Sequence, residues 1–324
     1  MQRLLSFLLK AAVSAGLLYL SLRRVNLESL GQQLSRLNWQ WVVLAVLIAC
    51  AQVPLVAWRW REIVVAGRCT LSQMTALRYT VIGQFFSQVL PSTVGGDAVR
   101  IWLLARGGAG WQIAIYSVLI DRVIGVTVLA TLVAGCLPWT FQLVHDPAAR
   151  AALILIGFGA LGAALVFLGL GIPQLKFFDR WWPTRHLATA SRLAWRLCGS
   201  LAGIRVAFVS FAIHFLTVSL AWSAAMAAHA SIDFTQTLFL VLPVVLVATI
   251  PISIAGWGVR ESAMVLAFSY AGLMESDGLI VSILYGFTTL AVGAIGGIVW
   301  IASGYRWQSI KAVETDTHAH DSSA

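Results

Sequence analysis

Charged side chains interrupt long apolar stretches at three places in this chain. They are Asp97 and Arg100 after the first stretch, Asp121 and Arg122 within the second, and Arg260 and Glu261 within the third. The guanidinium group carries forked donors that match the oxygens of a phosphate. Neighbouring carboxylates could relay protons or offset the arginine charge when no ligand is bound. We therefore predict that these six residues bind substrate, and we predict no catalytic residue.

The same residues also fit a purely structural role. Asp121 lies nine or ten residues into an expected helix, so its depth is about 14 Å at the usual rise per residue. A charge near the bilayer centre costs about 2.5–3.5 kcal/mol on insertion scales, so pairing or function is expected. The three acids could simply neutralise the three arginines. A polar binding cavity and a set of structural ion pairs both fit the residues.

Proline and glycine break the backbone in front of two of these charged groups. The segments read PSTVGGDAVR at 91–100 and PISIAGWGVR at 251–260. Proline disfavours helix at the residue before it, and glycine permits tight turns. Lipid cannot satisfy the freed backbone groups, so such breaks are buried in protein or line a wet cavity. A helix that resumes there points its N–H groups at the gap, which suits an anion. The expected break residues are Pro91, Gly95, Gly96, Pro251, Gly256 and Gly258.

Two glutamines form a polar stripe that leads into the first break. Gln84 and Gln88 are four residues apart and share one helix face. A path for a headgroup and hydrogen bonding between helices explain them equally well. We include both as candidate substrate-binding residues. We expect the two breaks to face each other across a polar cavity, with Arg100 on one side and Arg260 on the other.

The composition places these residues in a membrane protein. The chain has 324 residues, of which 59% are hydrophobic and 11% charged, and its mean hydropathy is +0.84. Soluble domains have about 25% charged residues. The net charge of +9 comes from Lys and Arg clustered between apolar runs, as in cytoplasmic loops, so no nucleic-acid partner is expected. The four cysteines show no ligand spacing, and no nucleotide-binding or hydrolase motif occurs, so neither metal nor cofactor is predicted.

Apolar length predicts an all-α polytopic membrane protein with about eight transmembrane segments. A spanning helix needs about 20 mostly apolar residues. Six single helices are expected near 4–21, 38–58, 112–138, 151–172, 205–229 and 279–304. Two further apolar segments, 79–107 and 236–271, are interrupted by Pro and Gly. Each could be a re-entrant hairpin or two short spans. The membrane domain covers 1–305, and a polar tail at 306–324 is expected to be disordered.

Basic residues predict the orientation in the bacterial cytoplasmic membrane. The loop 176–205 has six Lys and Arg against one acid, and the connector 59–78 is also rich in arginine, so both should be cytoplasmic. Connectors 139–149, 230–235 and 272–278 contain no Lys or Arg and should face outside. Both termini are then cytoplasmic. The connector 22–37 fits badly, because it should lie outside yet carries three arginines.

The two broken segments belong to an internal repeat. Both fit the pattern P-x-[ST]-[VI]-[GA]-G-x-[AG]-V-R, and they stand at an offset of 160 residues. The flanking helices extend the match to two units, about 38–138 and about 205–304. Loop charges place these units in opposite orientations. Inverted repeats with broken helices are typical of transporters, because two such units can expose one site to each side in turn. An ancestral duplication without transport is the other interpretation.

Three motifs in order resemble the lysylphosphatidylglycerol synthase transmembrane family, also called the flippase-like or UPF0104 family. They are QFFSQVLPSTVGGDAVRIWLLARGG, LIDRVIG and ATIPISIAGWGVRESAMVLAF, and the resemblance covers about 5–305. The resemblance assigns the family's acid–arginine pair to Asp121 and Arg122, where aspartate replaces the more usual glutamate. Fused members are thought to flip an aminoacylated phospholipid made by a soluble C-terminal synthase domain. This chain shows no such domain, so it is not expected to charge lipids with lysine.

These observations lead to three hypotheses about function. The first is translocation of a membrane lipid, with a phospholipid, a glycolipid or a hopanoid-type lipid as candidates. The second is a membrane-embedded transferase on a polyprenyl or glycolipid substrate, with Asp97 or Asp121 as the base. The third is a non-catalytic subunit that accompanies lipid-biosynthesis enzymes.

Overall fold

The structure, a computed structural model, describes residues 35–90, 94–172, 182–250 and 256–304, together with positions 16, 19 and 31. Every secondary-structure element in these residues is helical. The elements are α3 (Trp39–Ala66), α4 (Gln73–Val89), α5 (Gly95–Leu104), η1 (Ala105–Ala109), α6 (Trp111–Leu143), α7 (Pro147–Gly169), α8 (Trp182–Cys198), α9 (Leu201–Ala227), α10 (Phe234–Ala248), α11 (Val259–Tyr270) and α12 (Glu275–Ala302). The all-helical fold is thus confirmed for the described residues, whereas the expected helix 4–21 and the tail 306–324 lie outside them.

Five of the helices are long and apolar enough to cross a membrane. They are α3, α6, α7, α9 and α12. Polar caps define several of their starts: Asp146 accepts a hydrogen bond from Ala149 N at the start of α7, and Ser200 caps α9 in the same way. Such caps satisfy backbone donors that the first helical turn leaves free. The chain is therefore an integral membrane protein.

Helix α3 is longer than the sequence predicts. It continues to Ala66, although the expected end was at 58. The prediction was wrong because it ended the span at the first charged residue, and Arg59 is in fact buried inside the helix. The buried guanidinium is tolerated because a carboxylate on another helix neutralises it. Arg59 is therefore an interior residue and not part of a cytoplasmic connector.

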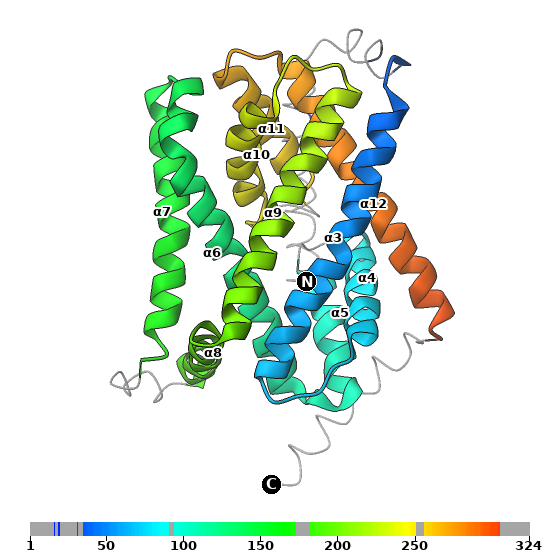
Figure 1. Ribbon diagram of the computed structural model, residues 1–324, viewed down its shortest axis with the longest axis vertical. Coiled ribbons are helices and arrows are strands. Elements are labelled where there is room, and N and C mark those ends of the chain that lie inside the picture. The colour runs from blue at the N-terminus through cyan, green and yellow to red at the C-terminus, as the bar shows by residue number, and fades with distance from the viewer. Residues whose placement is uncertain are drawn as a thin grey trace.

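The two broken segments form helical hairpins at opposite ends of the molecule. Helix α4 contacts α5, and α10 contacts α11. Figure 1 shows α4 and α5 in its lower half and α10 and α11 in its upper half. The 10 residues of α5 extend only about 15 Å at 1.5 Å per residue, which is half of a hydrocarbon core. Helix α11, with 12 residues, extends about 18 Å, so neither α5 nor α11 is long enough to cross the hydrocarbon core.

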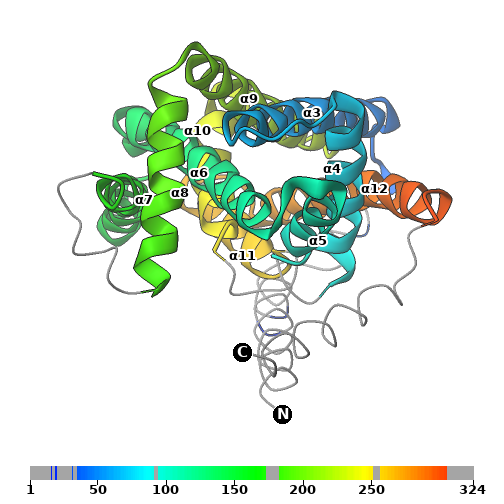
Figure 2. The same ribbon diagram turned by 90° about the horizontal axis from the view of Figure 1, so that it is seen from below.

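The hairpins pack against long helices of the other half of the chain. Helix α3 lies beside α9 along one side of the molecule, α4 packs on α12, and α10 packs on α6 (Figure 2). The α4–α12 contact is close because α12 presents glycine there. A Cβ atom at Gly296 would collide with the Val81 carbonyl, and one at Gly297 would lie 3.0 Å from the Phe85 ring. Small residues let membrane helices approach in this way.

The segment expected as a cytoplasmic loop, 176–205, contains the helix α8. Figure 2 shows α8 lying across the lower end of the molecule. Its buried residues Leu193 and Leu197 pack against Ile63 and Tyr116, while Arg196 is exposed. One apolar face and one basic face are typical of a helix that lies in the membrane interface. The charge-based prediction missed this helix because it counted basic residues without testing their period.

Candidate functional site

Four charged side chains from three helices meet in the interior below the centre of the molecule. Asp121 on α6 accepts hydrogen bonds from Arg59 Nε at 2.8 Å and from Arg100 Nη2 at 3.2 Å. Asp97 on α5 accepts one from Arg100 Nη1 at 3.4 Å. All four residues are buried. Arg100 thus joins the two aspartates, and Asp121 joins two arginines.

Arg122 completes this cluster from its edge. Its Nε donates to Asp97 Oδ2 at 2.6 Å, and its side chain remains 55% exposed. We call Arg59, Asp97, Arg100, Asp121 and Arg122 the first network. Three guanidinium groups face two carboxylates, so the network carries a net positive charge. One buried donor, Arg100 Nε, has no hydrogen-bond partner. An excess of cationic donors around a partly accessible arginine is suited to bind an anion.

Glycines and an aromatic ring hold Arg100 in place. Helices α4 and α5 cross at Gly83 and Gly96, where a Cβ atom on Gly96 would collide with the Gly83 carbonyl oxygen. A Cβ atom on Gly83 would lie 2.9 Å from Arg100 Cγ, so the arginine side chain runs directly over the glycine. The guanidinium lies 4.3 Å from the centre of the Trp60 ring. This cation–π contact orients it toward the aspartates.

A second, separate cluster surrounds Arg260 at the start of α11. Arg260 Nη2 donates to Glu261 Oε1 at 2.7 Å, and Arg260 Nε donates to Ser282 Oγ on α12 at 3.0 Å. The hydroxyl of Ser282 donates in turn to Glu261 at 3.0 Å. The other carboxylate oxygen of Glu261 accepts from Gly258 N at 2.6 Å. We call Arg260, Glu261 and Ser282 the second network, and its charges balance.

Two aromatic rings flank Arg260. The rings of Trp257 and Tyr285 are each 5.1 Å from its guanidinium carbon. The turn before α11 depends on glycine, because Gly256 and Gly258 have φ values of 81° and 85°. Gly286 leaves room for the arginine, since a Cβ atom there would lie 2.6 Å from Nη2. Arg260 is therefore held more tightly than Arg122.

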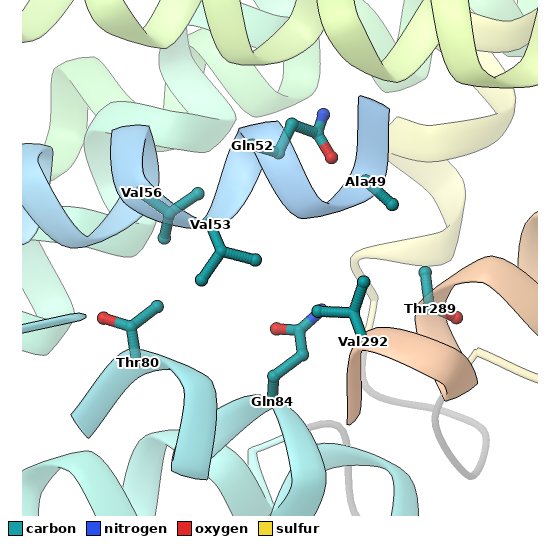
Figure 3. Close-up of a pocket in the computed structure, with 8 residues that line it drawn as sticks. All are labelled: Ala49, Gln52, Val53, Val56, Thr80, Gln84, Thr289 and Val292. Carbon is teal, nitrogen blue, oxygen red and sulfur yellow. The ribbon is translucent and has the colours of Figure 1, made fainter. Parts of the chain in front are cut away.

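A small cavity lies between α3, α4 and α12, and Figure 3 shows its lining side chains. Its volume is about 60 Å³. The lining residues are Ala49, Gln52, Val53, Val56, Thr80, Gln84, Thr289 and Val292. Gln84 belongs to this lining. Gln88 instead packs on α12, where its Cγ would lie 3.2 Å from a Cβ atom at Gly293.

The remaining candidate residues are placed as follows. Gly95 begins α5, and a Cβ atom there would lie 2.6 Å from Leu90 Cβ. Pro91 and Pro251 lie outside the described residues. Within the described part of the chain, no group of three or more His, Cys, Asp and Glu residues is placed to hold a metal ion.

Sequence reasoning missed several partners of the predicted arginines. The charge pattern places Arg59 in a loop, and it gives no indication of Trp60, Ser282 or Tyr285. The hydrogen bond from Arg59 to Asp121 joins residues 62 positions apart, and the one from Arg59 to Ser210 joins residues 151 apart. One signal in the sequence was that Asp121 lies inside a predicted span and therefore needs a basic partner. Arg59 and Asp121 could have been paired had the first helix been extended.

Comparisons with known proteins agree with the three motifs. The sequence model described as "Lysylphosphatidylglycerol synthase TM region" matches residues 7–297. A UPF0104 membrane protein of Pyrococcus horikoshii is 21% identical over 281 residues, which are 77% of this chain and 82% of that protein. The match to the family model spans nearly the whole membrane region, including both networks and the cavity. The chain therefore belongs to the family of the lysylphosphatidylglycerol synthase TM region.

Proposed function

We propose that this protein moves an amphipathic lipid between the two leaflets of the bacterial cytoplasmic membrane. A phospholipid, a glycolipid or a hopanoid-type lipid would keep its tail in the bilayer, so only the headgroup needs a polar route. The observation that carries the proposal is the first network. Three arginines face two aspartates inside an apolar helix bundle, and this excess positive charge fits a phosphate-bearing headgroup.

The order of the helices supports an inverted repeat, an arrangement that many transporters use for alternating access. A long helix, a hairpin and a second long helix occur as α3, α4–α5 and α6, and again as α9, α10–α11 and α12. The contacts match as well. Exchanging the two units turns the α4–α12 contact into α10–α6 and leaves the α3–α9 contact unchanged. Hairpins at opposite ends of the molecule fit two units in opposite orientations (Figure 1).

The orientation follows from the basic residues. We propose that the end bearing α8 faces the cytoplasm, because Arg185, Arg192 and Arg196 gather there. The first hairpin then opens to the cytoplasm and the second to the outside. Under this proposal a headgroup enters near the first network and leaves near the second. Lipid-biosynthesis enzymes on the cytoplasmic side are the natural suppliers of such a substrate.

A membrane-embedded transferase receives less support. It would need a free carboxylate as a base, and both candidates are engaged by two guanidinium groups each. Asp97 accepts hydrogen bonds from Arg100 and Arg122, and Asp121 from Arg59 and Arg100.

The proposal can be tested in liposomes. The purified protein is reconstituted with fluorescent lipids in the outer leaflet, and leaflet exchange is followed as protection from a membrane-impermeant quencher. The panel contains anionic phospholipids, zwitterionic phospholipids and a neutral glycolipid. We expect faster exchange than in protein-free liposomes for at least one lipid, with anionic headgroups favoured. A wild-type protein that moves no lipid in the panel would contradict the proposal.

A further inference from the structure

The cavity between α3, α4 and α12 lies between the two networks. On α3, its lining residue Val56 is one helical turn from Arg59. On α4, Thr80 is one turn from Gly83, over which Arg100 runs. On α12, Thr289 donates to the Gly286 carbonyl at 2.8 Å, and Gly286 lies against Arg260. The cavity therefore adjoins the first network on one side and the second on the other.

Two polar side chains of the cavity lining have no hydrogen-bond partner among the residues that the structure describes. Thr80 is buried and its Oγ1 has no hydrogen-bond partner. In the described structure the Gln84 amide also forms no hydrogen bond, and Figure 3 shows its side chain extending from α4 toward α3. The two residues are four apart on one helix, so they share a face. Buried polar groups are almost always paired with protein, ordered water or a ligand, so the buried Thr80 hydroxyl and the half-buried Gln84 amide are available to bind one.

The donors of the other two polar side chains of the lining are already engaged. Gln52 Nε2 donates to Ile213 O at 2.8 Å and to Thr217 Oγ1 at 2.7 Å, and Figure 3 shows its amide turned away from Thr80 and Gln84. The Thr289 hydroxyl donates to the backbone. The free donors of the lining therefore belong to Thr80 and Gln84. Both offer donors and acceptors without charge.

The equivalent place in the second unit is apolar. Under the exchange of units, α3, α4 and α12 correspond to α9, α10 and α6. A hollow lies between these helices too, and its lining residues are Leu132, Phe208, Phe211, Ala212, Phe215, Leu216 and Leu238. The helix arrangement by itself thus does not require a polar lining. The polar residues Thr80 and Gln84 line the hollow of the first unit, and the hollow of the second unit has no polar counterpart among the described residues.

We propose that this cavity binds the hydroxyl groups of a lipid headgroup while the first network holds the phosphodiester. The inference rests on the lipid transport proposed above and names its substrate class, an anionic lipid with a polyol headgroup such as glycerol or a sugar. Hydroxyls donate and accept, which matches the threonine hydroxyl and the glutamine amide. No carboxylate lines the cavity, so an ammonium headgroup would lack a counter-charge there.

The size of the cavity sets a limit on what enters it. At about 30 Å³ for each water molecule in the liquid, a volume of about 60 Å³ holds about two waters. A few hydroxyl-bearing carbons can replace those waters, and a complete sugar ring requires α4 and α12 to separate. Glycerol is therefore the suitable test headgroup.

Two anionic lipids separate the effect of the hydroxyls from that of the phosphate. Phosphatidylglycerol carries headgroup hydroxyls, whereas phosphatidylethanol has the same charge and none. The wild-type protein should move phosphatidylglycerol about tenfold faster or more, because one neutral hydrogen bond changes a rate or affinity about fivefold and two are expected. In Thr80→Val combined with Gln84→Leu, the two rates should become equal through loss of phosphatidylglycerol exchange alone. Thr131→Val, at an exposed α6 position, should keep the preference.

The outcomes distinguish this inference from the proposed function. Equal exchange of both lipids by the wild-type protein would overturn the polyol site but leave lipid transport standing. If the double variant still moved phosphatidylglycerol faster than phosphatidylethanol, the polyol site would likewise be overturned and lipid transport would stand. Exchange of neither lipid, nor of any other, would reject transport itself. Native mass spectrometry in detergent then tests the site directly, because the wild-type protein should retain short-chain phosphatidylglycerol over phosphatidylethanol and the double variant should not.

Discussion

Asp121 is the residue at which the buried charges of three helices meet. It belongs to α6 and accepts hydrogen bonds from α3 through Arg59 and from α5 through Arg100. A buried ion pair is not by itself a source of stability, because desolvation offsets much of the attraction. Removal of one partner is costly, however, since it leaves a charge buried without compensation. The first network should therefore be most sensitive at its acids.

Asp121→Asn should destabilise the protein by about 3–5 kcal/mol, because Arg59 loses its carboxylate and Arg100 loses one of its two. Thermal unfolding in mild detergent measures the effect. Glu62→Gln is the control. Glu62 pairs with Arg61, and their side chains are 12% and 32% exposed, so the loss of this pair should cost less than the loss of the buried Asp121. Equal unfolding temperatures for the two variants would show that Asp121 does not hold the network together.

Part of the residue-scale picture could be predicted from the sequence. Charge within an apolar run indicated Asp97, Arg100 and Asp121, because only pairing or function makes such charge tolerable. The partners could not be predicted. Trp60 stacks on Arg100 from a different helix, and no spacing along the chain indicates that contact.

At the scale of elements, the first hairpin depends on the close crossing of its two arms. Gly83 on α4 and Gly96 on α5 leave no room for a side chain at the crossing. The proline and glycine pattern predicted that the helix breaks here. It did not predict Gly83, which lies well before the break and faces α5 only once the hairpin has folded.

Gly96→Ala should cost about 1–3 kcal/mol and displace α5 from α4, because the new methyl group would overlap the Gly83 carbonyl and Ser87 Oγ. Gly162→Ala is the matched control on α7. A Cβ atom there meets nothing within 4 Å, so the helix should gain up to about 1 kcal/mol. Unfolding midpoints of the two variants should move in opposite directions. A neutral Gly96→Ala would contradict the close crossing.

Cys198 is exposed at the end of α8. Chemical labelling of this cysteine tests on which side of the membrane α8 lies. Desolvation by burial raises the pKa of this thiol, and a backbone hydrogen bond lowers it by less. The thiolate is the reactive form, so maleimide labelling should be slower than for a free thiol at neutral pH and should accelerate as pH rises. In a variant with alanine at Cys50, Cys69 and Cys136, Cys198 is the one cysteine left to react with the maleimide. Labelling should occur only from the cytoplasmic face; labelling from the outer face would reverse the proposed orientation.

At the scale of the whole molecule, most of the buried charges of the described residues gather in two separate networks within an apolar helix bundle. The repeat at 91–100 and 251–260 predicted the two hairpins, because proline and glycine recur at a fixed offset. The sequence suggested that Arg100 and Arg260 face one cavity directly. The structure instead places each in its own network with the cavity between them, an arrangement that depends on packing of α4 against α12. The contact between α4 and α12 joins distant parts of the chain, so no short sequence pattern predicts it.

The central claim is that the excess positive charge of the first network binds the headgroup of a transported lipid. Arg100→Gln tests it most directly, because Asp97 keeps Arg122 and Asp121 keeps Arg59, so the remaining charges balance. The measurement is the initial rate of leaflet exchange of a fluorescent anionic lipid in proteoliposomes, with Arg205→Gln at an exposed position as the control. We predict a rate at least about tenfold below wild type, since a charge-assisted hydrogen bond contributes about 1.5–3 kcal/mol. A rate equal to that of the wild-type protein, from a variant that unfolds at the same temperature, would contradict the account.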